Sequence, residues 1–241
     1  MKIPSLNDPE VFELASRAKH PPQIARLLLL IARAYDPKMK LAIGGGIAVR
    51  DTGWGRHTDD VDIFARPVSA KRLVKGLAAQ GVKTFWITDA HAVAYLDEDN
   101  AESLAAGEAP SVRVDILSTV TEPEASAIRT AVAPRVLGVP MKVFRADHLA
   151  AIKFLAGRPL DLIDFDEIIR LGADLDRVRY IVASVDESRV AALMARARKA
   201  LAPSSRGVRD GGEGRYLDRD ALQRVWKTLH AAQGAPVRRA S

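Results

Sequence analysis

The chain has 241 residues, of which 48% are apolar and 27% are charged, as is ordinary for a globular protein with a sizeable core. It contains no cysteine, which excludes disulfide bonds and thiolate metal sites, so a metal ion would be bound by carboxylates, histidines or substrate. No apolar run approaches the roughly 20 residues that span a bilayer, and the N-terminus lacks the apolar segment of a secretion signal. We therefore expect a cytoplasmic protein with no membrane association.

Hydrophobic periodicity, prolines and glycines predict alternating helices and strands up to about residue 145. The expected helices span residues 9–18, 22–35, 47–51, 69–80 and 123–130. The expected strands span residues 40–43, 60–65, 83–87, 93–96 and 112–117. The acidic segment 97–110 is interpreted as a loop or a short helix, and Gly138-Val139-Pro140 as the turn of a hairpin.

The pattern becomes helical after this part of the chain, with helices expected at 147–156, 160–171, 176–184 and 187–201. A Gly- and Ser-rich stretch then predicts a mobile linker, and residues 217–232 predict one more helix. We therefore predict four parts: an α/β domain over residues 1–145, a helical region over 146–202, a flexible linker over 203–215, and a C-terminal helix and tail over 216–241.

The net charge of +6 is unevenly distributed along the chain. Residues 1–173 hold 22 basic and 22 acidic side chains, whereas residues 174–241 hold 14 and 8. A basic C-terminal region can bind a polyanion such as RNA, and it can equally be the solvated surface of a helix. Composition favours neither interpretation.

Leu41 to Phe64 is the stretch with the clearest chemical pattern. It begins with a short apolar run that ends in Gly44, Gly45 and Gly46, where unobstructed backbone N–H groups ahead of a helix suit a phosphate. It closes on Asp60 and Asp62, which the period of a strand places on one face. The glycine turn matches neither a P-loop nor a dinucleotide fingerprint, so by itself it is a weak signal.

A third carboxylate, Asp115, lies on another alternating segment, with apolar residues at 112, 114 and 116. If the two strands are neighbours, ladders about 4.8 Å apart let three aspartates converge on one or two Mg²⁺ ions. The alternative is that all three aspartates simply face water or begin a turn. Taken together with the glycine turn, the three favour a site for metal-dependent chemistry on a nucleotide.

Three motifs resemble the nucleotidyltransferase superfamily with its polymerase-β-like palm: GGG at 44–46, RHTDDVD at 56–62 and VDI at 114–116. Downstream, DHLAAIK at 147–153 and RPLDLID at 158–164 resemble the bacterial AbiEii branch, which comprises the toxins of type IV toxin–antitoxin pairs and uncharacterised relatives. The match covers roughly residues 40–172. It implies an α/β (α+β) fold with a mixed sheet and flanking helices, followed by a helical C-terminal region.

The resemblance also implies an activity, transfer of a nucleoside monophosphate from an NTP to an acceptor with loss of pyrophosphate. Gly45 and Gly46 would form the phosphate-binding turn, and Asp60, Asp62 and Asp115 would bind Mg²⁺, with Mn²⁺ as an alternative. Three glycines stand where many relatives have Gly-Ser, so the phosphate would lose a hydroxyl donor and depend more on backbone N–H groups. Asp115 would ligate the metal near the nucleophile and accept its proton.

Lys153 would reach the triphosphate in that scheme, with Asp161 near it. The physical alternatives are that Lys153 extends to solvent from an amphipathic helix and that Asp161 and Asp164 favour the helix dipole at a helix start. We interpret Asp164 as structural. Arg158 can hold either aspartate or a phosphate.

The loop before the aspartate pair adds candidates. Arg56 is expected to bind phosphate and Thr58 to shape the strand entry through its hydroxyl. His57 and His91 are interpreted as surface histidines.

The acceptor is left open by the sequence. A tRNA or other RNA is favoured, a small-molecule hydroxyl is second and a protein side chain third. An antitoxin protein is an expected partner if the chain is a toxin. The alternative from another class is a binding component without catalysis.

Overall fold

The computed structural model describes residues 3–119, 121–135 and 137–185. It divides the chain into two compact units, residues 1–145 and a unit that begins at Ala146. The expected helices at 187–201 and 217–232, the linker at 203–215 and the tail lie outside the described residues. The predicted four-part organisation therefore stays a prediction.

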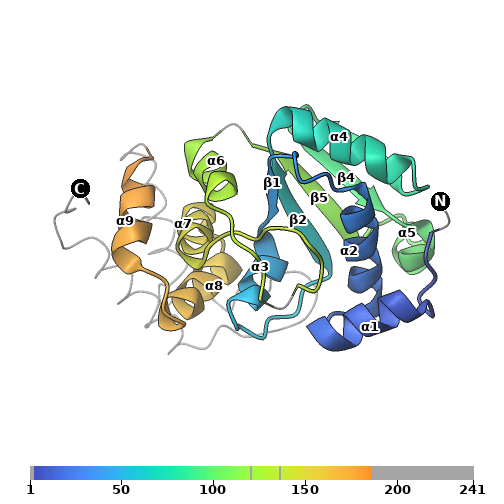
Figure 1. Ribbon diagram of the computed structural model, residues 1–241, viewed down its shortest axis with the longest axis horizontal. Coiled ribbons are helices and arrows are strands. Elements are labelled where there is room, and N and C mark those ends of the chain that lie inside the picture. Colours follow the sequence, from blue (N-terminus) through green and yellow to red (C-terminus); the bar gives the residue numbers. More distant parts are fainter. Residues whose placement is uncertain (1–2, 120, 136, 186–241) are drawn as a thin grey trace. The chain divides into compact units, whose positions relative to one another are not determined.

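The order of the elements follows the expected alternation in the first unit and is all-helical in the described part of the second (Figure 1). The first unit contains α1 (Pro9–Ala18), α2 (Pro22–Ala34), β1 (Leu41–Ile43), α3 (Gly45–Asp51), β2 (Asp60–Ala65), α4 (Pro67–Ala78), β3 (Lys83–Thr88), β4 (His91–Tyr95), the 3₁₀ turn η1 (Asp97–Asp99), α5 (Ala101–Ala105), β5 (Arg113–Ser118) and α6 (Glu122–Arg129). The second contains α7 (Ala146–Ala156), α8 (Pro159–Arg170) and α9 (Leu175–Ala183).

The five strands described in the first unit form one mixed sheet in the order β1-β2-β5-β4-β3. β2 and β5 are parallel, and the other neighbouring pairs are antiparallel. Because β5 is inserted between β2 and β4, strands that are distant in sequence lie side by side. This mixed sheet with flanking helices is the expected fold class.

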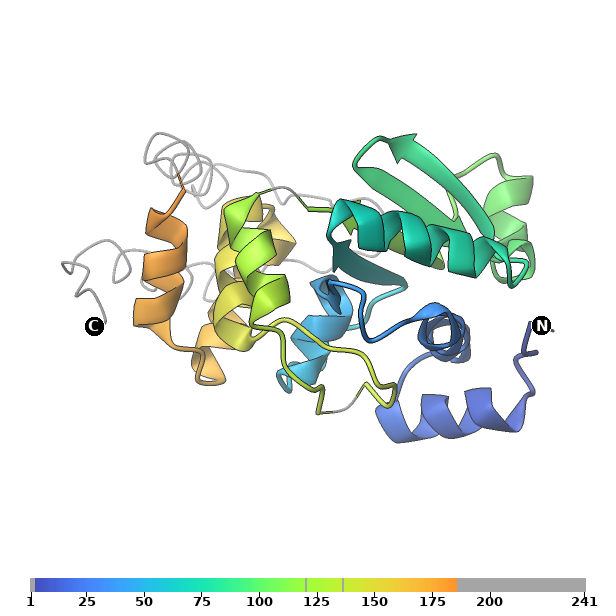
Figure 2. The same ribbon diagram turned by 45° about the horizontal axis from the view of Figure 1, so that its top comes forward.

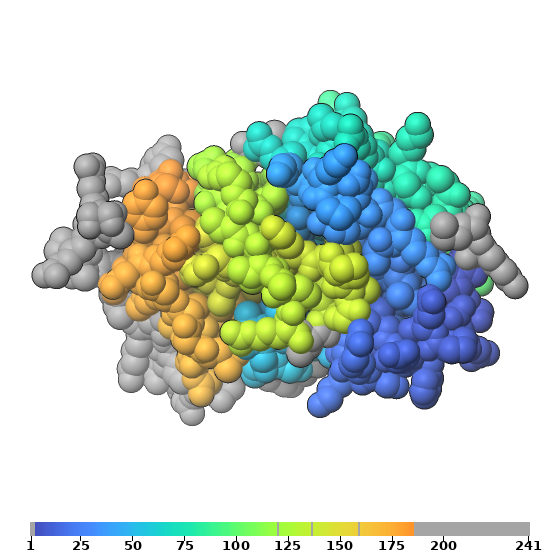
Figure 3. Space-filling model, viewed as in Figure 1, coloured from blue at the N-terminus to red at the C-terminus, as the bar shows by residue number. Residues whose placement is uncertain are grey.

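The apolar face of the sheet forms the core of the first unit. Val61, Ile63, Val114 and Ile116 are fully buried on it. α2 and α4 contact each other and β2 (Figure 1 and Figure 2). The outer surfaces of α1 and α4 are visible in the space-filling view, in dark blue and teal (Figure 3). The alternation along β2 and β5 therefore directs their polar residues to the opposite face.

Local capping signals set the helix ends. The Asp8 carboxylate accepts a hydrogen bond from the Glu10 N–H at 3.0 Å, which caps α1. α4 begins two residues before its predicted start, because Pro67 has the backbone angle that suits a first helical turn. It also ends earlier, and the chain then turns at Gly81, whose φ is +88°.

Three local predictions need correction. α3 begins at Gly45 rather than at residue 47, so the last two glycines belong to its first turn. β4 begins at His91, two residues before its predicted start, because pairing with β5 extends to His91 and Leu117. The predicted hairpin around residues 138–140 is instead part of a wider loop, and an antiparallel bridge joins Val132 to Val143.

The second unit is held by contacts of α7 with both α8 and α9. Phe154 on α7 packs against Phe165 on α8, with ring centroids 5.6 Å apart. Arg177 on α9 forms an ion pair with the buried Asp147 on α7 at 2.8 Å. Across both units, none of the helices that the structure describes is long and apolar enough to cross a membrane.

Candidate functional site

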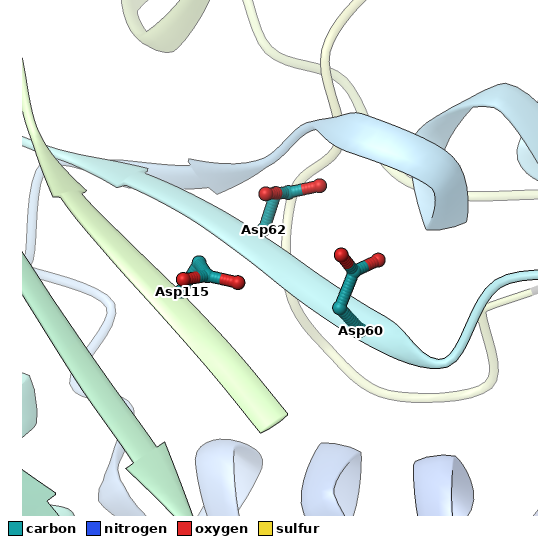
Figure 4. Close-up of side chains that lie close together, drawn as sticks. All are labelled: Asp60, Asp62 and Asp115. Atoms are coloured by element: carbon teal, nitrogen blue, oxygen red, sulfur yellow. The ribbon is translucent and has the colours of Figure 1, made fainter. Parts of the chain in front are cut away.

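Asp60, Asp62 and Asp115 lie together on the polar face of the sheet (Figure 4). One carboxylate oxygen from each lies within 4.8 Å of those of the other two. Asp60 and Asp62 are half-buried, and Asp115 is 7% exposed. The convergence that the alternating patterns predicted is thus present in the structure.

The parallel pairing of β2 with β5 produces this convergence. Asp62 is the register partner of Asp115, and Asp60 lies one period of the strand before Asp62. Register partners in a ladder have side chains on the same face. A slip of one residue would direct Asp115 into the core, and the buried Val114 and Ile116 prevent it.

Thr58 fixes the orientation of Asp60. Its hydroxyl donates to Oδ1 of Asp60 at 2.7 Å, and the threonine itself is buried. Gly46 makes this arrangement possible, since a Cβ there would lie 2.5 Å from Oγ1 of Thr58. The expected role of Thr58 at the strand entry therefore has a structural counterpart in this hydrogen bond.

The other two glycines bring α3 against β2. At Gly45, where φ is +54°, a Cβ would lie 1.6 Å from Oδ2 of Asp62. At Gly44 it would lie 2.5 Å from the ring of Phe64. Close packing by itself requires glycine in this turn, and phosphate binding by the turn stays a prediction.

Two side chains that the sequence did not mark as functional contact Asp115. Nε2 of His91 on β4 lies 2.7 Å from Oδ1, and Nε of Arg113 on β5 donates to Oδ2 at 2.9 Å. The interpretation of His91 as a surface histidine is wrong, because its side chain is only 31% exposed and is bonded to this aspartate. The period of two across β4 places it on the polar face, but only the strand order reveals its neighbour.

The remaining loop residues lie just before β2. Arg56 is half-buried, and its backbone N–H donates to the Trp54 carbonyl at 2.8 Å. His57 is exposed, as expected, and its Nε2 lies 2.8 Å from Oδ1 of Asp59. A phosphate contact by Arg56 stays a prediction.

The three aspartates fit a hard divalent cation. Their donor set is all carboxylate, which suits Mg²⁺ or Mn²⁺. Octahedral Mg²⁺ binds its oxygens at about 2.1 Å, so ligand oxygens lie about 3 to 4 Å apart. The oxygens of this cluster, all within 4.8 Å of one another, are close to that spacing and could bind a metal ion.

Lys153, the fourth predicted catalytic residue, belongs to the second unit, where it is 6% exposed. Its Nζ lies 2.8 Å from Oδ1 of Asp161 and 3.0 Å from Oδ2 of Asp164. The alternative that this lysine extends to solvent is therefore wrong. Its contact with a triphosphate stays a prediction.

Asp161 accepts from two cations. Arg158 donates to its Oδ2 at 2.5 Å and to its Oδ1 at 3.2 Å. Of the partners considered for this arginine, the structure therefore shows a pairing with Asp161. Burial raises the pKa of Asp161, but the hydrogen bonds from Arg158 and Lys153 and the charges of both residues outweigh it and lower the pKa. Asp164 is fully buried, in agreement with a structural role.

No protein-family model and no curated protein matches the chain. Among solved structures it is similar to the antibiotic-resistance factor ANT(2″)-Ia in solution, at 20% identity over 73% of this chain and 97% of that one, with a TM-score of 0.48. Crystalline ANT(2″)-Ia in complex with adenylyl-2″-tobramycin gives 18% identity over 76% and 100%, and a TM-score of 0.39.

A further similar structure is the STING-associated c-di-GMP synthase CdnE from Capnocytophaga granulosa, at 10% identity over 92% of this chain and 80% of that one, with a TM-score of 0.28. Because all three TM-scores are low, the function proposed below depends on the geometry of the carboxylate site.

Proposed function

We propose that this chain is a metal-dependent nucleotidyltransferase, which transfers a nucleoside monophosphate from an NTP to an acceptor hydroxyl and releases pyrophosphate. The convergence of Asp60, Asp62 and Asp115 within 4.8 Å, from adjacent parallel strands, carries this proposal. Three carboxylates so close together repel one another, and a divalent cation offsets that repulsion. The sequence motifs around them, including the glycine turn, support the same reaction.

Each of the three aspartates has a role in the proposed reaction that follows from its position. Asp60, oriented by Thr58, and Asp62 would hold Mg²⁺, with Asp115 as the third ligand. When bound, the metal ions would neutralise charge on the triphosphate and on the departing pyrophosphate. Asp115 would accept the proton of the acceptor hydroxyl. The bond from the acceptor oxygen to the α-phosphorus forms as the bond from that phosphorus to pyrophosphate breaks.

RNA, such as the 3′ end of a tRNA, is the acceptor that we favour. The support is the excess of basic residues in the last 68 positions, where 14 Lys and Arg accompany 8 Asp and Glu. A small-molecule hydroxyl is the second candidate, and a protein side chain the third. RNA contributes many phosphates, so its binding should weaken steeply as salt concentration rises.

A toxin role of the AbiEii kind is part of the proposal, supported by the motifs at 147–153 and 158–164. An antitoxin would then be the protein partner. Expression of the wild-type chain should arrest growth in a bacterial host, and the Asp62→Asn variant should not. Growth unaffected by the wild-type chain would remove the toxin role and leave the transfer reaction as it is.

Label transfer tests the enzymatic proposal directly. The purified chain is incubated with each α-labelled NTP, Mg²⁺ and total tRNA, beside the Asp62→Asn variant. Label on RNA that disappears in the variant would support the reaction and name the nucleotide. NTP binding that requires Asp62, without label on RNA, would move the acceptor to a small molecule or protein. If the chain neither transfers label nor binds NTP, the catalytic proposal is overturned and a binding component without catalysis is favoured.

A further inference from the structure

We propose that His91 is a positioning residue for Asp115: together with Arg113 it fixes the orientation of this carboxylate toward the acceptor hydroxyl and limits its contact with a bound metal ion. The inference rests on the proposed function and deepens it. In this arrangement Asp60 and Asp62 supply most of the affinity for the metal. Asp115 is kept turned toward the acceptor hydroxyl.

The carboxylate of Asp115 contacts a second side chain at each of its oxygens. Oδ1 lies 2.7 Å from Nε2 of His91, and Oδ2 accepts from Nε of Arg113 at 2.9 Å. An ionised carboxylate can only accept hydrogen bonds, so Nε2 of His91 carries the hydrogen. Each oxygen of Asp115 therefore has one N–H donor, and the two donors fix the plane of the carboxylate.

The two donors are themselves held in place by the sheet. His91 lies on β4 in register with Leu117, and Nη1 of Arg113 also donates to the Pro110 carbonyl at 2.8 Å. Both side chains thus come from the sheet, His91 from β4 and Arg113 from β5, the strand that carries Asp115. Asp60 differs, because its described partner on Oδ1 is the neutral Thr58 hydroxyl.

The two N–H donors compete with a bound metal ion for the oxygens of Asp115. A lone pair that accepts an N–H is not available to a cation, and the guanidinium charge of Arg113 repels one. Removal of either donor should therefore strengthen metal binding. The same removal lets Asp115 rotate away from the acceptor, so turnover should fall. Opposite directions for metal affinity and turnover distinguish a positioning role from a simple loss of structure.

The test measures Mn²⁺ binding by electron paramagnetic resonance and, separately, kcat and KM for NTP. In His91→Leu we expect Mn²⁺ to bind several-fold more tightly and kcat to fall about 10-fold or more, with KM changed little. His91→Gln keeps an N–H donor at a similar reach and should restore both values toward wild type. Arg113→Gln should tighten Mn²⁺ binding in the same direction.

His57 provides the matched control, because its Nε2 makes a contact of 2.8 Å with Asp59, outside the carboxylate cluster. His57→Leu should leave Mn²⁺ affinity and kcat unchanged. Weaker or unchanged Mn²⁺ binding in His91→Leu would overturn the inference, as would failure of His91→Gln to restore kcat. If wild-type Mn²⁺ binding does not require Asp62, the proposed function itself fails, which is a separate outcome.

Discussion

Asp60 with Asp62 in the first unit and Asp161 with Asp164 in the second are aspartate pairs in different surroundings. Asp161 and Asp164 are almost fully buried and enclose the ammonium of Lys153 at 2.8 and 3.0 Å. Asp60 and Asp62 are half-buried and lie beside a third carboxylate, that of Asp115. Buried carboxylates around a cation depend on that cation to stay charged inside the fold, whereas half-exposed carboxylates around one another are arranged for a ligand.

Asp62→Asn, which changes one member of the first pair, should have the largest effect on activity. Loss of one metal ligand is expected to lower transfer activity by about 10³-fold or more. Thermal stability without metal should stay the same or rise slightly, because one of three neighbouring negative charges is removed. Label transfer and thermal unfolding measure the two effects.

Asp59→Asn is the control, since Asp59 is exposed and paired with His57. It should keep nearly full activity. An Asp62→Asn protein that remains active, or one that no longer folds, would contradict the distinction between the two pairs.

Lys153→Met should show the opposite pattern to Asp62→Asn, with its main effect on stability. It leaves two buried carboxylates without their common cation, which is expected to cost about 3 kcal/mol of unfolding free energy. Urea unfolding of the whole chain measures it, and Lys75→Met on the exposed side of α4 should change stability by less than about 0.5 kcal/mol.

Kinetics on the same variant test the sequence prediction for Lys153. A role confined to the ion cluster leaves the KM of the folded fraction for NTP unchanged. A contact with the triphosphate raises it. Unchanged stability together with a raised KM would contradict the structural interpretation of this lysine.

The difference between the two pairs was not visible in the sequence. The alternation around Asp60, Asp62 and Asp115 is local information, so the strands and the face of each aspartate could be predicted. The environment of Lys153 depends on α8, which brings Asp161 and Asp164 onto α7. The resemblance placed Asp161 near Lys153, whereas helical spacing alone left open the alternative of a lysine that extends to solvent, which tertiary packing excludes.

His91 shows the same limit within the site. The expected strand began at residue 93, and the register shift between Trp86 and Thr88 in the pairing of β3 with β4 has no clear local signal. The neighbour of His91 follows only from the strand order, in which β5 is inserted between β2 and β4. Strand order is set by packing of the whole sheet, so Asp115 could be predicted and its two donors could not.

His20 is a buried titratable group outside both aspartate pairs. Among the residues that the structure describes, neither of its buried ring nitrogens has a hydrogen-bond partner, and burial together with the charge of Arg50 lowers its pKa from 6.5 to about 4. Above pH 6.5 the ring is neutral in both states and stability is full. As the pH falls from 6.5 to about 4, only the unfolded chain gains the proton, so the fold should lose about 3 kcal/mol.

Urea unfolding between pH 7.5 and 4 measures this loss. His20→Leu should flatten the profile in that window, since leucine fills a similar volume and does not titrate. His57→Leu should leave the profile unchanged, because His57 is exposed. An identical slope in wild type and His20→Leu would assign the pH dependence to other groups.

Arg158→Gln gives the smallest expected effect and isolates the contribution of burial. Like Lys153, Arg158 donates to Asp161, at 2.5 and 3.2 Å, but its side chain is 73% exposed. Water can replace an exposed guanidinium, so the loss should be about 0.5 kcal/mol, well below that of Lys153→Met. The pKa of Asp161 should rise toward its usual value, which moves acid unfolding to slightly higher pH, since stability from a lowered carboxyl pKa is lost as the pH falls. A loss as large as that of Lys153→Met would mean that Arg158, rather than the buried lysine, is the main counter-charge of Asp161.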